Sequence, residues 1–323
     1  MNVTASLAAS FLVLLAAVCA AQVPASRPQD PAALREQGLK TLAEQGITLD
    51  LAKKTVTIDA VVNAPPDPIE YVLVHRRGKS HEAMFLTEVK PTSLNAALIM
   101  LGFEPGKNAD YKEKNPLPSL EEVEKGAPTV DIIHPEGMPV WMTVSFARAD
   151  ANADAKGDAK PDAKPDAKTE TKTETKTDAK GDATVTLPLE DLLIDIQAQR
   201  TVTAQSWVFL GGRHASLYKG EPEVFVADFE GNLVSCCYLL PHNHLVTMKH
   251  ERSPDDQNWW IADAMPPPGT KARFTFHREM PQVSRDREAR VQEELKKQGP
   301  ASRPAGGAAG QPATGPASAP QKK

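Results

Sequence analysis

The sequence predicts an α+β fold: a β-rich single domain of antiparallel strands with one main packed helix, plus a disordered insertion and tail. Three observations predict this class. Short segments in which apolar and polar residues alternate recur along most of the chain, as half-buried strands require. Only the segment after Pro91 combines helical spacing with enough apolar residues to pack on a sheet. Residues 150–182 and 299–323 have almost nothing to bury.

Residues 1–20 have the pattern of a secretory signal peptide. No charged side chain occurs before Arg27, and an apolar run from Phe11 to Val18 is followed by small residues up to Ala20. The apolar run is shorter than the ~20 residues of a spanning helix, although an uncleaved anchor is the alternative. We therefore expect a secreted or periplasmic protein of the bacterial cell envelope, with no membrane span after signal cleavage.

The predicted elements before the insertion begin with a short amphipathic helix from Pro31 to Gln45, within an N-terminal segment of residues 21–53. The main domain, residues 54–278, then starts with strands. A helix follows Pro91, and Gly102 ends it. The three predicted strands are Thr55–Val62, Ile69–His75 and Glu82–Glu88, with a turn at Arg76–Lys79 between the last two.

A charged tetrad repeat interrupts the domain. The units GDAK, PDAK, TETK and TDAK run from Gly157 to Lys180, and on a helix they would place like charges four residues apart. We therefore expect disorder over residues 150–182. Alternating residues on both sides of the repeat predict strands, and loop closure costs only about 0.6 kcal/mol per doubling of length. An insertion at the tip of a hairpin is thus favoured over a linker between two domains.

Beyond the insertion the pattern is mostly β. Turn signals separate the strand candidates, and residues 279–298 predict a charged helix that lies on the surface or frays. Residues 299–323, rich in Pro, Ala and Gly, predict a disordered tail. The strand candidates are Ser206–Leu210, Glu223–Ala227, Leu233–Leu239 and Ala272–His277.

Charge and cysteine content exclude some functions. The formal net charge of -5 gives no basic footprint for nucleic acid. Signal cleavage would remove Cys19 and leave the adjacent Cys236 and Cys237, which cannot supply the four thiolates of an iron–sulfur cluster. Neighbouring residues of a strand point to opposite faces, so the two thiols cannot act together as ligands without a distorted backbone, and we expect two small buried or half-buried side chains. A strained vicinal disulfide in an oxidising compartment is the alternative.

Several segments resemble the YdjY-like domain of secreted bacterial proteins, a family without established activity. The resemblance covers roughly Lys54 to Arg278 and implies fold and location rather than function; some members have carried a ferredoxin-like label, which the cysteine count does not support. The tetrad repeat and the cysteine pair depart from the family pattern. The segments that carry the resemblance are Gly78-Lys79-Ser80-His81-Glu82, Leu101-Gly102, Trp207-Val208-Phe209 with Gly211, Ala227-Asp228-Phe229-Glu230-Gly231-Asn232, and Pro266-Pro267-Pro268-Gly269-Thr270.

The turn after the second predicted strand is the first candidate site. Arg76, Arg77 and Lys79 beside a glycine can receive an anion or a carboxylate. His81 and Glu82 add a possible base or metal ligand. An ordinary solvated hairpin tip is the alternative interpretation.

His242-Asn243-His244 is the second candidate. In an extended segment both imidazoles lie on one face, within reach of a single Zn²⁺ or Cu²⁺. A further ligand would come from His250, His214 or Cys236. Two surface histidines in a loop are the alternative.

The sequence lacks the common nucleophile, phosphate-binding, dinucleotide-binding and metalloprotease motifs, which leaves the catalytic residues unknown. We expect a non-catalytic binding or interaction module of the cell envelope, whose partner is an envelope protein or a small ligand. One alternative is a metal-binding protein or metal-dependent enzyme using His81, Glu82, His242 and His244. The other is an enzyme that acts on an anionic small molecule at the turn from Arg76 to His81.

Overall fold

The computed structural model describes residues 30–148, 174–177, 183–203 and 206–298. The predicted signal peptide, the tail and most of the insertion lie outside these residues. The chain divides into two compact units, residues 1–38 and residues 39–323. Of the first unit the structure describes the beginning of helix α1, Pro31–Glu44, where the Asp30 carboxylate accepts a hydrogen bond from the Ala32 backbone N–H at 3.0 Å.

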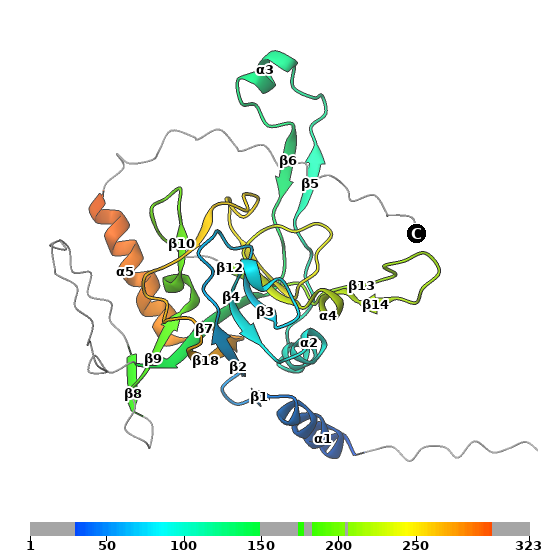
Figure 1. Ribbon diagram of the computed structural model, residues 1–323, viewed down its shortest axis with the longest axis vertical. Coiled ribbons are helices and arrows are strands. Elements are labelled where there is room, and N and C mark those ends of the chain that lie inside the picture. The colour runs from blue at the N-terminus through cyan, green and yellow to red at the C-terminus, as the bar shows by residue number, and fades with distance from the viewer. Residues whose placement is uncertain (1–29, 149–173, 178–182, 204–205, 299–323) are drawn as a thin grey trace, which may run out of the picture. The chain divides into compact units, whose positions relative to one another are not determined.

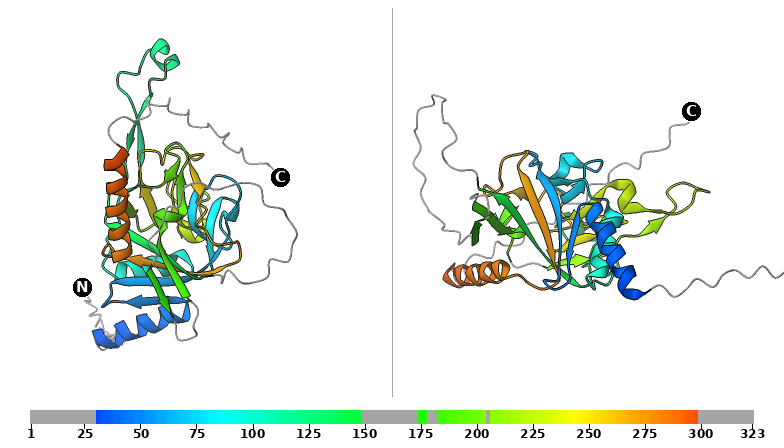
Figure 2. Two further views of the ribbon diagram at one scale, coloured as in Figure 1. Left: turned by 90° about the vertical axis from the view of Figure 1, so that its left-hand side faces the viewer. Right: turned by 90° about the horizontal axis from the view of Figure 1, so that it is seen from below.

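Eight strands in the described part of the second unit close into a barrel (Figure 1, Figure 2). The ring closes because the last strand, β18, pairs with β2 along one edge and with β7 along the other. Around the ring the strands are β2 (Thr55–Val62), β4 (Ala83–Thr87), β3 (Tyr71–His75), β15 (Asn232–Ser235), β16 (Val246–Lys249), β12 (Ser206–Phe209), β7 (Pro139–Ala147) and β18 (Lys271–His277).

The barrel sheet is mixed, which corrects the prediction of antiparallel strands. β3 runs parallel to β4, with Tyr71 opposite Ala83. β15 runs parallel to β16, with Val234 opposite Val246. The other neighbouring pairs in the ring are antiparallel. Alternation of apolar and polar residues reports which face a side chain occupies but not the direction of the neighbouring strand, so the sequence pattern could not reveal the two parallel pairs.

A hairpin cannot join parallel neighbours, because the chain must first travel back along the length of the strand it has just left. Residues 76–82 form the crossover connection from the end of β3 to the start of β4. Residues 236–245 form the corresponding connection from β15 to β16. We call them the first and second return segments. Since β3 and β15 are paired neighbours, the two return segments belong to adjacent strands of the barrel. The first return segment ends in the short helix η1, Ser80–Glu82.

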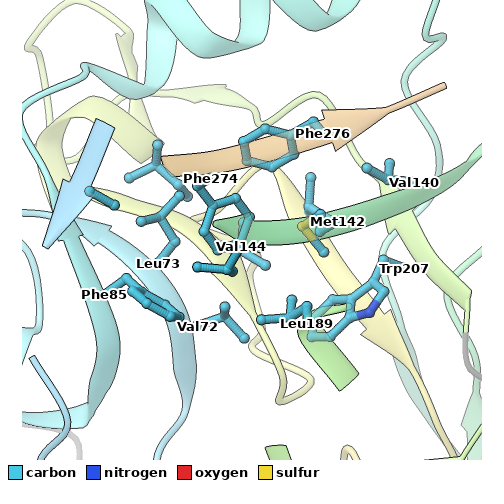
Figure 3. Packing of buried hydrophobic residues seen from close by; sticks show 14 of the residues in the cluster. Val72, Leu73, Phe85, Val140, Met142, Val144, Leu189, Trp207, Phe274 and Phe276 are labelled. Atoms are coloured by element: carbon cyan, nitrogen blue, oxygen red, sulfur yellow. The ribbon is translucent and has the colours of Figure 1, made fainter. Parts of the chain in front are cut away.

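Alternate side chains fill the barrel interior. β2 buries every second residue from Val56 to Val62, as the sequence pattern predicts. β18 contributes Phe274 and Phe276, both fully buried. Phe85 of β4 packs edge-to-face on Phe274 with ring centroids 5.7 Å apart (Figure 3). The core is therefore built jointly by strands from both sides of the insertion.

Three further strands extend the barrel sheet. β1 (Ile47–Asp50) pairs with β2, and β9 (Ala183–Pro188) pairs antiparallel with β7. Ala147 stands opposite Thr184, so the intervening chain leaves and re-enters the sheet at one end of this pair, as an insertion at a hairpin tip does. β8 (Glu174–Thr177), within the segment predicted to be disordered, pairs with β9. The edge of β9 offers unpaired backbone groups for this pairing.

Helix α2, Pro91–Met100, is the main packed helix that the sequence predicts. It buries Leu94, Ala97 and Leu98. Its first turn is capped from another element, because the Asp228 carboxylate accepts hydrogen bonds from the backbone N–H of Thr92 at 2.8 Å and from the Thr92 hydroxyl. An acidic group at a helix N-terminus satisfies free N–H groups and the helix dipole.

Asp228 belongs to helix α4, Val226–Glu230. This helix corrects the predicted strand Glu223–Ala227, of which only β14, Val224–Phe225, is extended. Gly231 ends α4 in the left-handed region, with φ +77°, a conformation that favours glycine at the end of a helix. A single helical turn between two short strands is too brief to leave a periodic signal in the sequence.

Helix α5, Gln282–Gln298, occupies the region of the predicted charged helix. It does not simply lie in solvent, because Arg287 is 4% exposed. The Arg287 guanidinium donates hydrogen bonds to the Asp191 carboxylate and to the carbonyl of Val202. These polar contacts of Arg287 add to the few apolar anchors of the helix, such as Val283, which is 7% exposed.

Smaller elements complete the described chain. Two hairpins, β5–β6 and β13–β14, project from the barrel (Figure 1). A separate three-stranded sheet is formed by β10, β11 and β17. Within the described residues no helix is both long enough and apolar enough to cross a bilayer. The remaining elements are β5 (Asp110–Glu113), α3 (Leu120–Glu124), β6 (Val130–Ile133), η2 (Leu189–Leu192), β10 (Leu193–Asp195), β11 (Arg200–Thr201), β13 (His214–Ala215) and β17 (Trp259–Ile261).

Candidate functional site

The two return segments carry the residues that the sequence singles out, and Tyr71 of β3 touches both segments. The Lys79 ammonium of the first return segment lies over the Tyr71 ring, 5.6 Å from its centroid. The Tyr71 hydroxyl donates a hydrogen bond to Asn243 Oδ1 of the second return segment at 3.4 Å. The parallel strand pairs thus bring together two candidate sites that are far apart in the sequence.

Two basic groups of the first return segment, those of Arg76 and Lys79, face carboxylates. The Arg76 guanidinium pairs with the Glu88 carboxylate. Lys79 Nζ lies 3.5 Å from Glu70 Oε2 and 3.6 Å from Glu82 Oε2. Because these cations already have anionic partners, an incoming anion would have to compete with the protein's own carboxylates.

Arg77 and His81 lie at the exposed side of the same segment. Arg77 is exposed, and its backbone N–H donates to His75 Nδ1 at 3.2 Å. The His81 side chain is 73% exposed, with Nε2 3.2 Å from Glu82 Oε1. The structure therefore divides the predicted turn, with Lys79 and Glu82 against the barrel and Arg77 and His81 toward solvent.

Glu70 and Glu82 form a carboxyl pair beside Lys79. Burial raises the pKa of the Glu70 carboxyl above its ordinary range; Lys79 opposes this shift, and the neighbouring Glu82 carboxyl adds to it. The Oε2 atoms of both residues are buried and have no hydrogen-bond partner among the described residues. The Lys79 ammonium offsets the negative charge of this carboxyl pair.

The Tyr71 hydroxyl is the start of a polar chain into the second return segment. Burial raises the pKa of Tyr71, and the hydrogen bond to Asn243 opposes this rise. The Asn243 Oδ1 also lies 3.2 Å from His244 Nδ1. Because a carbonyl oxygen only accepts, Nδ1 of His244 donates and its Nε2 carries the lone pair. Tyr71 and Asn243 therefore orient the His244 ring.

His242 and His244 lie close together, as the sequence predicts for this pair. Their ring centroids are 6.3 Å apart, with an interplanar angle of 78°. Burial lowers the pKa of His244 to about 3, and burial also lowers the pKa of His242. The Nε2 atoms of both rings are buried and lack a hydrogen-bond partner in the described part of the chain. At neutral pH this is a pair of neutral imidazoles with free lone pairs.

The other residues predicted to complete a metal site lie in other surroundings. His214 packs against Phe225, with ring centroids 5.1 Å apart. His250 packs against Trp259 at 5.0 Å, and Cys236 Sγ donates to the carbonyl of Ile69. Among the described residues, no group of three or more His, Cys, Asp or Glu side chains is placed to hold a metal ion. His81 and Glu82 therefore do not complete a ligand set with His242 and His244.

Sequence reasoning missed Glu70 and Tyr71, and it named Asn243 only as the residue between the two histidines. Tyr71 reads as an ordinary strand residue, and Glu70 as a polar residue at a strand end. Their role depends on a return segment crossing the strand that precedes it. No alternating pattern signals this arrangement, although the short spacing between the second and third predicted strands is compatible with it.

A projecting arm, residues 110–133, is a second candidate surface. Strands β5 and β6 pair from Asp110 opposite Ile133 to Glu113 opposite Val130, and α3 sits at the tip (Figure 1, Figure 2). None of the side chains of this arm is buried, and the structure describes all of them. The tip exposes Leu117 by 61% and Leu120 by 76%. The arm is ordered without a hydrophobic core of its own.

Two of the segments that suggested a family, those around Gly78 and Gly231, lie against one another. A Cβ atom on Gly78 would stand 2.7 Å from the carbonyl oxygen of Gly231. That carbonyl accepts a hydrogen bond from the His75 backbone N–H at 2.7 Å. Residues 47–167 match the family model of the YdjY domain. The chain carries a YdjY-like domain. Searches of curated proteins and of solved structures found no significant match.

The matched range of the YdjY-like domain contains β1 through β7, and thus both strands joined by the first return segment. The barrel needs more chain than this range. Strands β12, β15, β16 and β18, which complete the ring, all follow residue 167. The second return segment and the histidine pair therefore lie beyond the family match but within the same barrel.

Proposed function

We propose that this protein is a non-catalytic interaction module of the cell envelope, whose YdjY-like domain binds a partner protein through the arm, residues 110–133. The observation that carries the proposal is the exposure of Leu117 and Leu120 at the tip of an ordered hairpin. An isolated two-stranded hairpin is marginally stable in water. Covering its apolar side chains with a partner stabilises both the arm and the complex.

The charges of the arm favour one kind of partner. Acidic residues outnumber lysines along the arm, so a surface with basic residues around an apolar groove is complementary to it. Ile132 and Ile133 on β6, 40% and 45% exposed, continue the apolar contact toward the barrel. The acidic residues are Asp110, Glu113, Glu121, Glu122, Glu124 and Asp131, and the basic ones are Lys112, Lys114 and Lys125.

Location in the cell envelope rests on the signal-like pattern of residues 1–20. Intact mass spectrometry of the protein recovered from the envelope fraction tests it. A mass that begins at Ala21 or Gln22 is the expected result. A chain that retains Met1 and stays in the cytoplasm would overturn the envelope assignment without bearing on the arm.

Site-specific photo-crosslinking tests the arm. A benzophenone amino acid at Leu120 is expected to capture one protein in producing cells, and the same group at Ile196, also exposed (47%), serves as the matched control. The captured protein, once identified and purified, should bind the wild-type chain saturably and more weakly at high salt. Leu117→Ser with Leu120→Ser should weaken binding at least about tenfold, since buried apolar anchors dominate such interfaces, whereas Ile196→Ser should not. Capture only of a second copy of the chain, or equal capture from both positions, would contradict the proposal.

Metal binding at His242 and His244 is a second candidate function. The specific observation is that both Nε2 atoms are buried and unpartnered, while Asn243 orients the His244 ring from Nδ1. Ligating histidines commonly donate their second nitrogen to such an outer partner. Zn²⁺ or Cu²⁺ should give a stoichiometric adduct in native mass spectra. The adduct should vanish in His242→Gln/His244→Gln and persist in His81→Gln; loss in His81→Gln would instead favour the four-residue site.

The third function that the sequence suggested, an enzyme for an anionic small molecule at Arg76–His81, draws less support from the geometry. Lys79 and Arg76 face carboxylates rather than an open cradle. We therefore rank it behind the interaction module and the histidine pair.

A further inference from the structure

Cys236 and Cys237 lie at the start of the second return segment, directly after β15. The chain bends there, so the two side chains do not point to opposite faces as an extended strand would require. Cys236 Sγ lies 3.4 Å from the carbonyl oxygen of Ile69, and Cys237 Sγ lies 4.0 Å from the same oxygen. Both thiols therefore converge on one acceptor, through a distorted backbone without which adjacent strand cysteines would point to opposite faces.

The bend is fixed by Ser235. Its hydroxyl oxygen accepts a hydrogen bond from the Cys237 backbone N–H at 3.1 Å and lies 3.0 Å from the Glu70 carbonyl, to which it donates. The Cys236 backbone N–H donates to that same carbonyl at 2.9 Å. Serine turns of this kind hold two following residues in a defined conformation. The dithiol is thus held before any oxidation occurs.

We propose that Cys236 and Cys237 form a redox-active vicinal dithiol, which closes to a disulfide by exchange with a small disulfide such as oxidised glutathione. Both thiols are free in the structure. The neighbouring Cys236 thiol and burial raise the pKa of the Cys237 thiol, which keeps this group protonated until the segment opens to solvent. Convergence on one carbonyl supplies the proximity that ring closure needs.

The exchange proceeds in two balanced steps. The thiolate of Cys237, formed by loss of its proton to solvent, attacks one sulfur of the small disulfide and releases one thiolate, leaving a mixed disulfide on Cys237. The Cys236 thiolate then attacks the Cys237 sulfur and releases the second thiolate. Two S–H bonds of the protein are lost and one S–S bond forms, while the small disulfide is reduced to two thiols.

Covalent geometry makes a disulfide between Cys236 and Cys237 strained, and therefore labile rather than structural. Adjacent Cα atoms are about 3.8 Å apart across a trans peptide, closer than the ~4.4–6.8 Å of ordinary disulfides. A strained disulfide is more easily reduced. Because both sulfurs are almost fully buried, at 0% and 2% residue exposure, exchange requires local opening of the second return segment.

Oxidation of the dithiol is expected to change the backbone surroundings of Tyr71. The dithiol is anchored on the carbonyls of Ile69 and Glu70, the two residues that precede Tyr71. Closing the ring removes both thiol donors from Ile69 and tightens the bend above Glu70. Backbone amide signals of residues 69–71 should therefore shift on oxidation, whereas those of the arm tip should not.

The test is redox equilibration of the purified full-length protein in mixtures of reduced and oxidised glutathione. After acid quenching and alkylation, the tryptic peptide between Lys219 and Lys249 carries both cysteines and no third one. It should appear in two forms, doubly alkylated or lighter by two hydrogens and unalkylated. The same ratio should be reached from the reduced and from the oxidised side. The equilibrium constant should fall about tenfold or more in urea, where the turn no longer holds the thiols together.

Cys236→Ser and Cys237→Ser are the matched controls, and each should lose the two-hydrogen form. Because the decisive measurement is on the wild-type chain, poor folding of a variant leaves the test intact. Glutathione adducts or intermolecular dimers as the only oxidised species would overturn the proposal. So would a peptide that stays doubly alkylated at every glutathione ratio, in folded protein and from both directions.

Discussion

Gly78 and Gly231 meet backbone to backbone, at the point where the first return segment passes the end of helix α4. A Cβ atom on Gly78 would lie 2.7 Å from the Gly231 carbonyl oxygen, and one on Gly231 would lie 2.8 Å from the Gly78 Cα. Neither neighbour is a flexible side chain that can move aside. The two backbones can approach this closely because neither residue carries a Cβ atom.

We predict that Gly78→Ala destabilises the protein by about 1–3 kcal/mol, the usual cost of overpacking a tight contact. Urea denaturation measures the effect. Gly220→Ala is the matched control, because Gly220 has a φ of +89° but a Cβ atom there would meet no other atom within 4 Å. The control should cost only about 1 kcal/mol from its left-handed backbone. Equal stability of Gly78→Ala and wild type would contradict the backbone contact.

The hydrogen bond between Tyr71 and Asn243 should couple the two return segments. We expect Tyr71→Phe and Asn243→Ala each to lower the free energy of unfolding, with a coupling of about 0.5–1.5 kcal/mol in a double-mutant cycle. Ser216→Ala paired with Tyr71→Phe is a control cycle, since the Ser216 hydroxyl bonds elsewhere, to the carbonyls of Tyr218 and Glu221. Strict additivity of Tyr71→Phe and Asn243→Ala would show that the segments are independent.

The buried histidines predict loss of stability in acid. Burial lowers the pKa of His244 to about 3 and that of His277 to about 4, against an ordinary value of 6.5. At pH values between these lowered pKa values and 6.5, the unfolded chain binds protons that the folded chain does not. The free energy of unfolding therefore falls as the pH drops from 6.5. Each group contributes a slope of up to about 1.4 kcal/mol per pH unit.

Denaturation with urea at a series of pH values between 7.5 and 4 checks this. His244→Gln and His277→Gln should each flatten the dependence, and the double variant should flatten it further. A wild-type stability that does not change over this range would rule out two neutral buried imidazoles.

Glu190 predicts the opposite pH dependence. It is 6% exposed, and its Oε1 accepts a hydrogen bond from Trp207 Nε1 at 2.9 Å. Burial raises the pKa of this carboxyl above the ordinary 4.5, while Arg287 opposes the shift. Between pH 4.5 and the raised pKa, the folded chain therefore holds a proton that the unfolded chain releases. The resulting contribution to the free energy of unfolding is complete below pH 4.5 and is lost as the pH rises through the raised pKa.

Glu190→Gln keeps an oxygen acceptor for Trp207 and removes the charge. We expect it to stabilise the protein at pH 8 by about 1–3 kcal/mol, the range for relieving an imperfectly compensated buried charge, and to have little effect at pH 4. Thermal or urea unfolding at the two pH values measures the difference. Destabilisation at pH 8 would instead mean that the charged carboxylate is held by Arg287.

The local elements were largely predictable. The alternation in Thr55–Val62 and Ala272–His277 placed two barrel strands, because burial on one face depends only on residues two apart. The helix after Pro91 was equally clear, as its apolar spacing and Gly102 act locally. Helix α4 and the arm were missed, since a single helical turn and a hairpin without buried side chains leave little pattern.

The amino-acid sequence by itself determined the approximate bounds of several barrel strands, the position of the main packed helix, and which polar residues stand out as candidates. Only the tertiary structure decided that β3 with β4 and β15 with β16 run parallel. That choice depends on pairing between distant strands, which local periodicity does not encode. The parallel pairing places Lys79 over the Tyr71 ring and Asn243 beside the Tyr71 hydroxyl. It also places the thiols of Cys236 and Cys237 beside one carbonyl oxygen.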